Sequence, residues 1–356
     1  MTRLFFALLV ASSLSAQTTK NVVLVVTDGL RWQDVFTGAD SSILFGDPRA
    51  LGDTAVIRRD FWRPTAEARR RTMMPFLWGT VAKDGQIFGN ATKGSSAQIT
   101  NGLKFSYPGY NEMLTGAADP KIRSNNFGKN PNETVFETLS KRPGFSNQVA
   151  AFGTWGVFRD IFNTSRATGV FVRAGFDPPI ASPRTRSDST LNRLYRTTFR
   201  QWDDNAYDAF MQTSLLDHLR DHRPRVLFVG YGETDEWAHS GRYDRVLRSA
   251  RAVDDYIAEL WRTLQSMPEY RGTTSMIITT DHGRGSVGNT WRDHGENVDG
   301  AENIWIAIIG PDTPALGERT ASPRVTQSQI AGTLAALLGQ EYAAGAPAIG
   351  DAIRKR

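Results

Sequence analysis

Short apolar runs rich in β-branched residues recur along the chain and predict buried strands. The first of these runs, residues 21–26, reads NVVLVV and ends in Thr27, Asp28 and Gly29. Continuous apolar runs of this length are expected of strands that are buried on both faces of a sheet. Four further runs have the same character: residues 149–152, 225–230, 276–280 and 304–309.

Helical patterns separate these strands and define the fold class. They cover residues 132–140, 205–219, 243–267 and 327–338. Strands that alternate with helices predict an α/β fold with a doubly wound, mostly parallel sheet and helices on both faces.

Three of the predicted strands lead to an aspartate: Asp28, Asp235 and Asp281. Ligands of such sheets bind beyond the carboxyl ends of the strands, so these aspartates mark a candidate site. A single aspartate after a strand is usually a helix cap or a turn residue. Caps or turns alone explain all three aspartates poorly, because two of the aspartates are accompanied by a histidine.

Two long segments interrupt the alternation of strands and helices. Residues 31–103 show little periodicity, and residues 155–200 contain eight arginines against three acidic residues. We expect both to be insertions within a single domain that spans residues 17–356. The arginine-rich segment is either a solvated loop face or a lid that meets an anionic substrate.

The first 16 residues have the layout of a secretory signal peptide. Residues 1–3 supply a positive charge, residues 4–10 are apolar, and residues 11–16 are mostly small. This arrangement predicts cleavage after Ala16 and a periplasmic or secreted protein. The apolar run is too short for a membrane anchor, and we expect no membrane span after cleavage.

Composition narrows the possible chemistry. The chain has 356 residues, of which 40% are hydrophobic and 22% are charged, as is usual for soluble globular proteins. The net charge of +5 is modest and no lysine-rich tail is present, which gives little support to a stable nucleic-acid partner. The absence of cysteine excludes thiolate metal sites and a cysteine nucleophile. Composition leaves the oligomeric state open.

Histidines accompany two of the aspartates in recognisable patterns. Asp235 and His239 are four residues apart, so a helix would place both on one face, where they can share a metal ion. Asp281 and His282 are adjacent, and His294 lies in a second Asp-His-Gly sequence. Together with Asp28 they provide six nitrogen and oxygen ligands, which suit two Zn²⁺ ions.

A candidate nucleophile lies in KFSYPGYNEMLTG, residues 104–116. Ser106 stands at the predicted start of a short helix, where backbone N–H groups and the helix dipole favour an anion. A simple turn is the alternative interpretation. Coordination to Zn²⁺ would lower the pKa of the Ser106 hydroxyl and activate it without a histidine base.

These motifs together resemble the alkaline phosphatase superfamily, which includes nucleotide pyrophosphatases/phosphodiesterases and sulfatases. Five landmarks carry the resemblance, in the order that the family has: DGLR at 28–31, FSYPGYNEMLTG at 105–116, DEWAH at 235–239, TDHG at 280–283 and SQIAGTLAALLG at 328–339. The resemblance implies an alkaline phosphatase-like catalytic domain that covers most of the mature chain.

The resemblance also implies roles for individual residues. Those that would hold one metal ion are Asp28, Ser106, Asp281 and His282. Those that would hold the other are Asp235, His239 and His294. Asn126 resembles the phosphate-binding asparagine of the phosphodiesterase branch, with Asn125 as the fallback because the spacing is one residue shorter.

Three positions depart from the family patterns. The nucleophile is a serine where phosphodiesterases usually have threonine, Tyr110 stands where the sulfatase signature has arginine, and Gly29 replaces the second aspartate of a sulfatase calcium site. We therefore expect an exported two-zinc hydrolase of small-molecule phosphate esters, a phosphomonoesterase or phosphodiesterase, with a phosphoserine intermediate at Ser106. The alternatives are a sulfatase-like hydrolase and an inactive secreted binding protein on the same fold. A dianionic monoester would need an arginine from residues 155–200.

Overall fold

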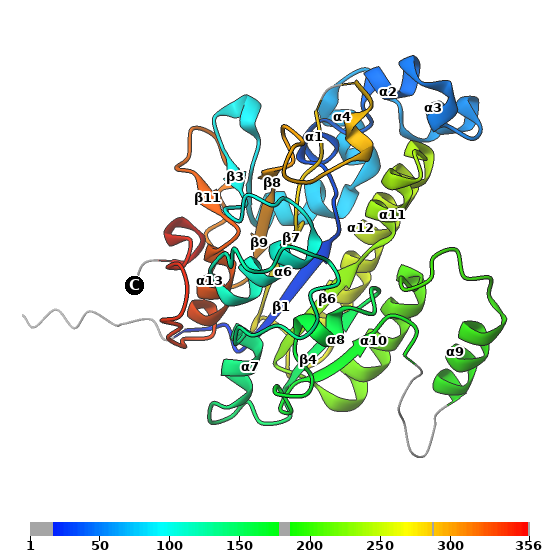
Figure 1. The fold of residues 1–356 in the computed structure, drawn as a ribbon. Helices are drawn as coiled ribbons and strands as arrows, with labels where there is room; N and C mark the ends of the chain where they lie inside the picture. Colours follow the sequence, from blue (N-terminus) through cyan, green and yellow to red (C-terminus); the bar gives the residue numbers. More distant parts are fainter. Residues whose placement is uncertain (1–16, 178–185, 287, 355–356) are drawn as a thin grey trace, which may run out of the picture.

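A central eight-stranded sheet organises the fold (Figure 1). The computed structural model describes residues 17–177, 186–286 and 288–354, so the expected signal peptide lies outside the described residues. From one edge to the other the strands are β10 (Gly317–Glu318), β2 (Gly85–Phe88), β9 (Ile306–Ile309), β7 (Thr274–Thr279), β1 (Asn21–Thr27), β6 (Val226–Tyr231), β4 (Val149–Gly153) and β5 (Phe171–Ala174). A smaller sheet contains β11 (Val325–Thr326), β3 (Ala97–Gln98) and β8 (Asn303–Ile304).

The predicted α/β class with a mostly parallel sheet is confirmed. Strands β7, β1, β6, β4 and β5 are parallel neighbours, with β1 hydrogen-bonded to both β6 and β7. The apolar run at 304–309 differs from the prediction. It divides between β8 and β9, and β9 is antiparallel to both β7 and β2.

Helices cover both faces of the sheet, and the side chains of β1 alternate between them as expected of a buried strand. Val22, Leu24 and Val26 pack into one core, whereas Val23 and Val25 pack into the other. The first core also contains residues of α6 (Ser106–Thr115), α7 (Val135–Ser140), α8 (Phe158–Ile161) and α13 (Gln329–Leu337). The second contains residues of α10 (Asp208–His222), α11 (Glu233–His239) and α12 (Tyr243–Ser266).

Residues 31–103 complete the second core. Val35 of α1, Ile57 of α3 and Leu77 of η2 are buried in it, so this segment contributes to the main domain as well as lengthening the chain. Its elements are α1 (Trp32–Thr37), α2 (Ser41–Gly46), η1 (Pro48–Ala50), α3 (Thr54–Phe61), α4 (Ala66–Met73), the π-helical η2 (Leu77–Val81), α5 (Ala82–Asp84) and η3 (Ala91–Lys93), besides β2 and β3.

Within residues 155–200 the structure describes α8, β5 and α9 (Arg186–Thr197). Helix α9 stands beside α10 at the periphery of the molecule (Figure 1). Two short 3-10 helices, η4 (Gly288–Arg292) and η5 (Gly350–Ala352), complete the described elements. Among the described helices, none combines the length and apolar character needed to cross a bilayer.

Candidate active site

Adjacent parallel strands bring the three predicted aspartates to one edge of the sheet. Asp28 follows β1 directly, and Asp281 lies two residues beyond the end of β7. Asp235 lies in the first turn of α11, which follows β6. Because β6 and β7 both pair with β1, their carboxyl ends meet at Asp28.

Ser106 is the first residue of α6, as its sequence context predicted. The helix packs very closely on the segment after β7, because a Cβ atom at Gly109 would lie 2.5 Å from the carbonyl oxygen of Asp281. Glycine at position 109 therefore allows α6 to approach Asp281. The Ser106 hydroxyl is buried and lies 3.4 Å from His282 Nε2.

A buried glutamate within α6 anchors this helix to its neighbours. Glu112 is fully buried and accepts hydrogen bonds from the backbone N–H groups of Thr100, Asn101 and Ser328. It also accepts from the side chains of Thr100 and Asn101. These contacts connect α6 to the preceding loop and to the start of α13.

The first group of predicted ligands surrounds His282 Nε2. This nitrogen lies 3.4 Å from Asp28 Oδ1, 3.5 Å from Asp281 Oδ2 and 3.4 Å from Ser106 Oγ. Bonds of about 2.0–2.1 Å to a tetrahedral ion place neighbouring ligand atoms roughly 3.3–3.4 Å apart. The distances of the three oxygens from His282 Nε2 are therefore close to those between ligands of a zinc ion.

In each of the two carboxylates of this group, one oxygen accepts a hydrogen bond and the other does not. The Tyr110 hydroxyl donates to Asp28 Oδ2 at 3.1 Å, and the Gly29 N–H donates to Asp281 Oδ1 at 3.0 Å. The remaining oxygens, Asp28 Oδ1 and Asp281 Oδ2, are buried and have no hydrogen-bond partner among the described residues. Buried carboxylate oxygens in this state need a cation or a donor, so they fit a metal ion.

Backbone carbonyls orient two of the histidines. His282 Nδ1 is 2.9 Å from the carbonyl oxygen of Gly283, and His294 Nδ1 is 3.2 Å from that of Lys104. When Nδ1–H of a neutral imidazole donates to a carbonyl, the lone pair is on Nε2, which is the usual arrangement of metal-binding histidines. Both Nε2 atoms then point into the cluster.

The second predicted group is equally close. His239 Nε2 lies 3.3 Å from Asp235 Oδ2 and 2.9 Å from His294 Nε2. The helical turn of α11 places Asp235 and His239 on one face, as their spacing predicted. His294 is near the first group too, because its ring stacks on that of His282 with centroids 3.9 Å apart.

Arg284 is a buried cation that no sequence motif indicated. Its side chain is 1% exposed and forms a close ion pair with Asp235 Oδ1. It also donates to the carbonyl oxygens of Gly29 and Arg292. Arg284 thus holds one oxygen of Asp235, while the other faces His239.

Burial and mutual proximity shift the pKa values of the cluster. Burial and the charge of Asp28 raise the pKa of Asp281 to about 7. Burial alone would lower the pKa of His282, but Asp281 and Asp28 outweigh it and raise the value to about 9. Burial and the neighbouring His282 lower the pKa values of His239 and His294, so both are neutral and able to bind a cation.

A cavity of about 200 Å³ opens beside these residues. Of the two candidate phosphate-binding asparagines, only one lines it. Asn125 lines the cavity, and its Oδ1 accepts from the backbone N–H of Tyr107 at 3.0 Å. Asn126 is exposed, and its backbone N–H donates to Ser124. The fallback Asn125 therefore has the better position, and Asn126 does not line the cavity.

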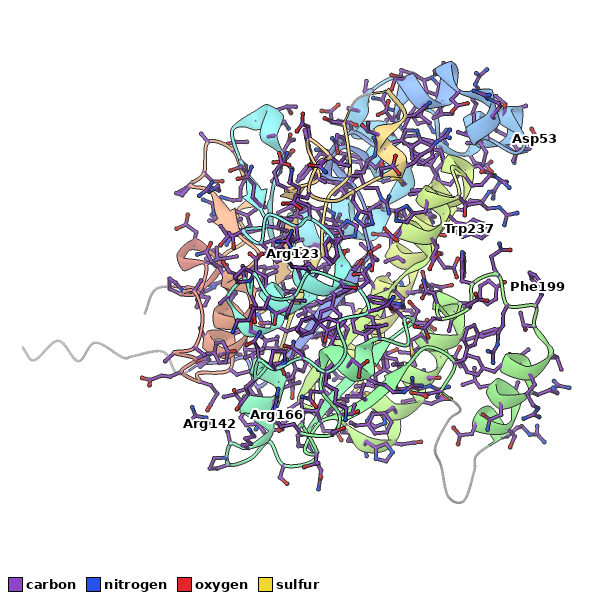
Figure 2. The ribbon with its side chains drawn as sticks, in the orientation of Figure 1. Asp53, Arg123, Arg142, Arg166, Phe199 and Trp237 are labelled. Atoms are coloured by element: carbon purple, nitrogen blue, oxygen red, sulfur yellow. The ribbon has the colours of Figure 1, made fainter. Side chains whose placement is uncertain are left out.

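The arginines of residues 155–200 do not reach this cavity in the described part of the chain. Arg159 pairs with Asp177. Arg166, which is labelled in Figure 2, pairs with Glu137 of α7. Arg200 lies over the ring of Phe176. The described residues that line the cavity include no arginine or lysine, so the expected arginine donor for a monoester is not found among them.

Four further residues contribute to the cavity wall: Trp155, Asn205, Gly232 and Glu236. Glu236 lies within the DEWAH motif, but its neighbours Asp235 and His239 already accounted for that motif. Trp155 and Asn205 come from loops after β4 and before α10, and they are joined by an isolated antiparallel bridge. No local sequence signal identified either residue.

Comparison with known families gives one match. The family model described as Type I phosphodiesterase / nucleotide pyrophosphatase matches residues 54–308. This range contains all the site residues except Asp28. No curated protein matches the chain significantly.

Several solved structures share the fold at low sequence identity. The lipoteichoic acid synthase LtaP from Listeria monocytogenes has a TM-score of 0.56 and 11% identity, over 95% of this chain and 74% of that one. The phosphonate monoester hydrolase SpPMH from Silicibacter pomeroyi has a TM-score of 0.55 and 14% identity, over 93% and 76%. A 2-O GAG sulfatase has a TM-score of 0.53 and 14% identity, over 92% and 73%.

Proposed function

Because the chain belongs to the type I phosphodiesterase / nucleotide pyrophosphatase family, we propose that it is a two-zinc hydrolase of phosphate esters with Ser106 as its nucleophile. The resemblance to the alkaline phosphatase superfamily that the motifs indicated is confirmed by this match and by the shared fold. The substrate class, the identity of the metal and the catalytic role of Ser106 are parts of the proposal.

One observation carries the proposal. The Ser106 hydroxyl, at the N-terminus of α6, lies 3.4 Å from the Nε2 atom around which the buried oxygens of Asp28 and Asp281 also gather. A nucleophile, a set of metal ligands and a helix N-terminus thus border one cavity. Helix N-termini favour phosphate, because their N–H groups are free and the dipole is positive there.

The two groups of ligands define where metal ions would bind. Asp28, Asp281 and His282, with Ser106, would hold one ion. The other ion would be held by Asp235, His239 and His294. When bound, a pair of zinc ions lowers the pKa of a coordinated hydroxyl and stabilises the charge that develops on the attacking and leaving oxygens.

The residues of the chain then divide the reaction between them. Ser106 gives up its hydroxyl proton to solvent, its Oγ attacks the phosphorus atom, and the bond from phosphorus to the ester oxygen breaks. The alcohol takes up a proton as it leaves, and a phosphoserine remains at Ser106. A water molecule then attacks this phosphoserine and releases phosphate or a phosphate monoester, which restores the serine.

Asn125 is suited to hold the phosphoryl group during both steps. Its Oδ1 is occupied by the N–H of Tyr107, which orients the amide and leaves its NH₂ group available to donate into the cavity. Donors aimed at the non-bridging oxygens stabilise the transition state more than the substrate. We assign the phosphate-binding role to Asn125 in place of Asn126.

The departure from the sulfatase signature at Tyr110 favours phosphate esters over sulfate esters as the substrate. The sulfatase signature has an arginine at this position, whereas here the Tyr110 hydroxyl donates to Asp28. The proposal keeps the expected export to the periplasm or the medium and a small-molecule substrate. If the chain were instead an inactive binding protein on the same fold, it would hydrolyse no ester.

The proposal is tested with p-nitrophenyl phosphate, bis-p-nitrophenyl phosphate and p-nitrophenyl sulfate, on the zinc-loaded protein and after chelation. We expect turnover of phosphate esters that is lost on chelation and restored by Zn²⁺. Ser106→Ala should lower kcat by roughly 10³-fold or more. Ser214→Ala, another buried serine whose hydroxyl donates to the backbone of Phe210, is the matched control and should retain activity.

Acid trapping followed by peptide mapping should find phosphate on Ser106. Phosphate on another residue, activity that survives exhaustive chelation, or near-normal activity of Ser106→Ala would refute the mechanism. Faster hydrolysis of the sulfate ester would favour the sulfatase-like alternative.

A further inference from the structure

Part of the cavity wall lies outside the metal-ligand set and has its own chemistry. Trp155, Asn205, Gly232 and Glu236 line the cavity beside the nucleophile and the ligands. Neither the ligand geometry nor the nucleophile requires these four residues. They are therefore available to recognise the organic part of a substrate.

Asn205 presents an acceptor that lacks a partner. The residue is 5% exposed, and its Nδ2 donates to Glu236 Oε1 at 3.3 Å. This bond fixes the orientation of the amide and turns Oδ1 away from Glu236. Oδ1 is buried and has no hydrogen-bond partner within the described ranges of the chain. A buried polar atom without a partner destabilises the folded protein, and a donor on a bound ligand would offset this cost.

The backbone is built to keep this amide in place. Asn205 forms the antiparallel bridge with Trp155, and the next residue, Ala206, donates its N–H to the carbonyl oxygen of Thr154 at 2.7 Å. A Cβ atom at position 232 would lie 2.3 Å from Asn205 Nδ2. Glycine at this position provides the space that the amide occupies, so the acceptor is rigidly held before any ligand binds.

Glu236 adds a second acceptor to the same wall. Its carboxylate takes the hydrogen bond from Asn205 and, when ionised, can only accept. Of the described residues that line the cavity, none is an arginine or a lysine. This wall therefore favours hydrogen-bond donors and disfavours a second anion. The half-buried Trp155 supplies aromatic surface on which the carbon atoms of a small group can pack.

We propose that Asn205 and Glu236 form a subsite for the second ester group of a phosphodiester, when that group is a small alcohol that carries a hydrogen-bond donor. The donor is a hydroxyl, as in glycerol or sugars, or an ammonium, as in amino alcohols. The cavity of about 200 Å³ is smaller than the roughly 300–1,000 Å³ of sites for drug-sized ligands, so the group is small. This proposal rests on the proposed phosphodiesterase chemistry.

Three diesters with the same leaving group test the subsite: the propyl, 3-hydroxypropyl and 3-aminopropyl esters of p-nitrophenyl phosphate. Release of p-nitrophenol by the zinc-loaded protein is measured, and the enzyme-free rate is subtracted. A site with buried acceptors rejects an analogue that leaves them unpaired. We expect kcat/KM for at least one donor-bearing ester to exceed that for the propyl ester by about tenfold or more.

Two variants test whether the preference for donor-bearing esters depends on Asn205. Asn205→Leu removes the acceptor while keeping a similar size, and should bring the ratio of donor-bearing to propyl ester close to one. Asn192→Leu is the matched control, because Asn192 is also 5% exposed with an amide that lacks partners in the described structure, but it lies on α9. This control should keep the wild-type ratio.

Glu236→Gln distinguishes the two kinds of donor. If the group is an ammonium, the aminopropyl ester is the best substrate and this variant abolishes its advantage over the hydroxypropyl ester. If the group is a hydroxyl, the hydroxypropyl ester remains the better of the two. Equal kcat/KM for all three esters, or an unchanged ratio in Asn205→Leu, would overturn the subsite alone. Absence of turnover with every ester would overturn the proposed function as well.

Discussion

The hydrogen bond from Tyr110 to Asp28 offers a sharp test of how the site is assembled. Tyr110→Phe removes one hydroxyl from a residue that is 1% exposed and leaves the ring contacts in place. Asp28 Oδ2 then loses its donor, while Oδ1 still faces His282. The perturbation acts on the orientation of a predicted metal ligand and on little else.

Two independent estimates give the size of the effect. A hydrogen bond to a charged group contributes about 1.5–3 kcal/mol. Loss of a group that orients a metal ligand typically costs about 10–100-fold in metal affinity, and each factor of ten corresponds to about 1.4 kcal/mol. The two ranges overlap, so we expect Tyr110→Phe to weaken zinc binding at this site by about 10–100-fold.

The assay is a competition titration of zinc against a chelator, combined with denaturant unfolding of the metal-free protein. Tyr243→Phe is the matched control, because Tyr243 is fully buried and its hydroxyl donates to a carboxylate oxygen of Asp34 at 2.6 Å. Both variants should lose stability, but only Tyr110→Phe should lose zinc affinity. Wild-type zinc affinity in Tyr110→Phe, or an equal loss in Tyr243→Phe, would show that the hydrogen bond does not position a ligand.

Three further predictions follow from buried or paired groups. Gly109→Ala should lower kcat/KM for phosphate esters, because the new Cβ atom would lie 2.5 Å from the carbonyl oxygen of Asp281 and displace the nucleophile helix; wild-type kinetics would contradict this. Burial raises the pKa of Asp254 to about 7, above its unfolded value near 3.8, so its contribution to stability is complete below about pH 4 and is lost as the pH rises through 7. Denaturant unfolding between pH 4 and 8 should show this loss, at most about 4 kcal/mol, in the wild type relative to Asp254→Asn, and parallel profiles would refute it. Arg159→Ala and Arg166→Ala should leave the ratio of p-nitrophenyl phosphate to bis-p-nitrophenyl phosphate turnover unchanged, because both arginines are paired away from the cavity; a selective loss on the monoester would restore the lid hypothesis.

The sequence predicted the edge of the sheet where the site lies because the relevant signals are local. The apolar runs before Asp28 and Asp281 are continuous, and parallel strands end at a common edge. The spacing of Asp235 and His239 is that of one helical turn, and α11 supplies that turn. Adjacent pairing of β6, β1 and β7 then brings these residues together.

Other parts of the fold lacked a local signal. Strand β2 is short, and its second residue is the polar Gln86, so no apolar run marks it. The antiparallel direction of β9 depends on its pairing with β7 and β2, which periodicity does not encode. The apolar residues of segment 31–103 are isolated in the sequence and become core only when its helices fold against the sheet.

The same limit applied to the site. Arginine is rarely buried, so Arg284 beside a histidine motif gave no reason to expect a cation within the cluster. Its burial is stabilised by Asp235 and the carbonyl oxygen of Gly29, which lie far from it in the sequence, and by the nearby carbonyl oxygen of Arg292. Asn125 and Asn126 are adjacent in an irregular loop, so the sequence could not tell which of them lines the cavity, and it is Asn125 that does so.

The anchoring groups of the site come from different layers of the fold, and this has a thermodynamic consequence. Tyr110 on α6 holds Asp28, Gly29 after β1 holds Asp281, and Arg284 beyond β7 holds Asp235. The ligand oxygens are therefore aligned only when α6 and the central strands are packed together. A metal ion bound by such a set stabilises the folded state selectively, because the unfolded chain offers no comparable site. Zinc should consequently raise the free energy of unfolding, and by less in Tyr110→Phe than in the wild type. Metal binding and the packing of α6 against the central strands are therefore thermodynamically coupled.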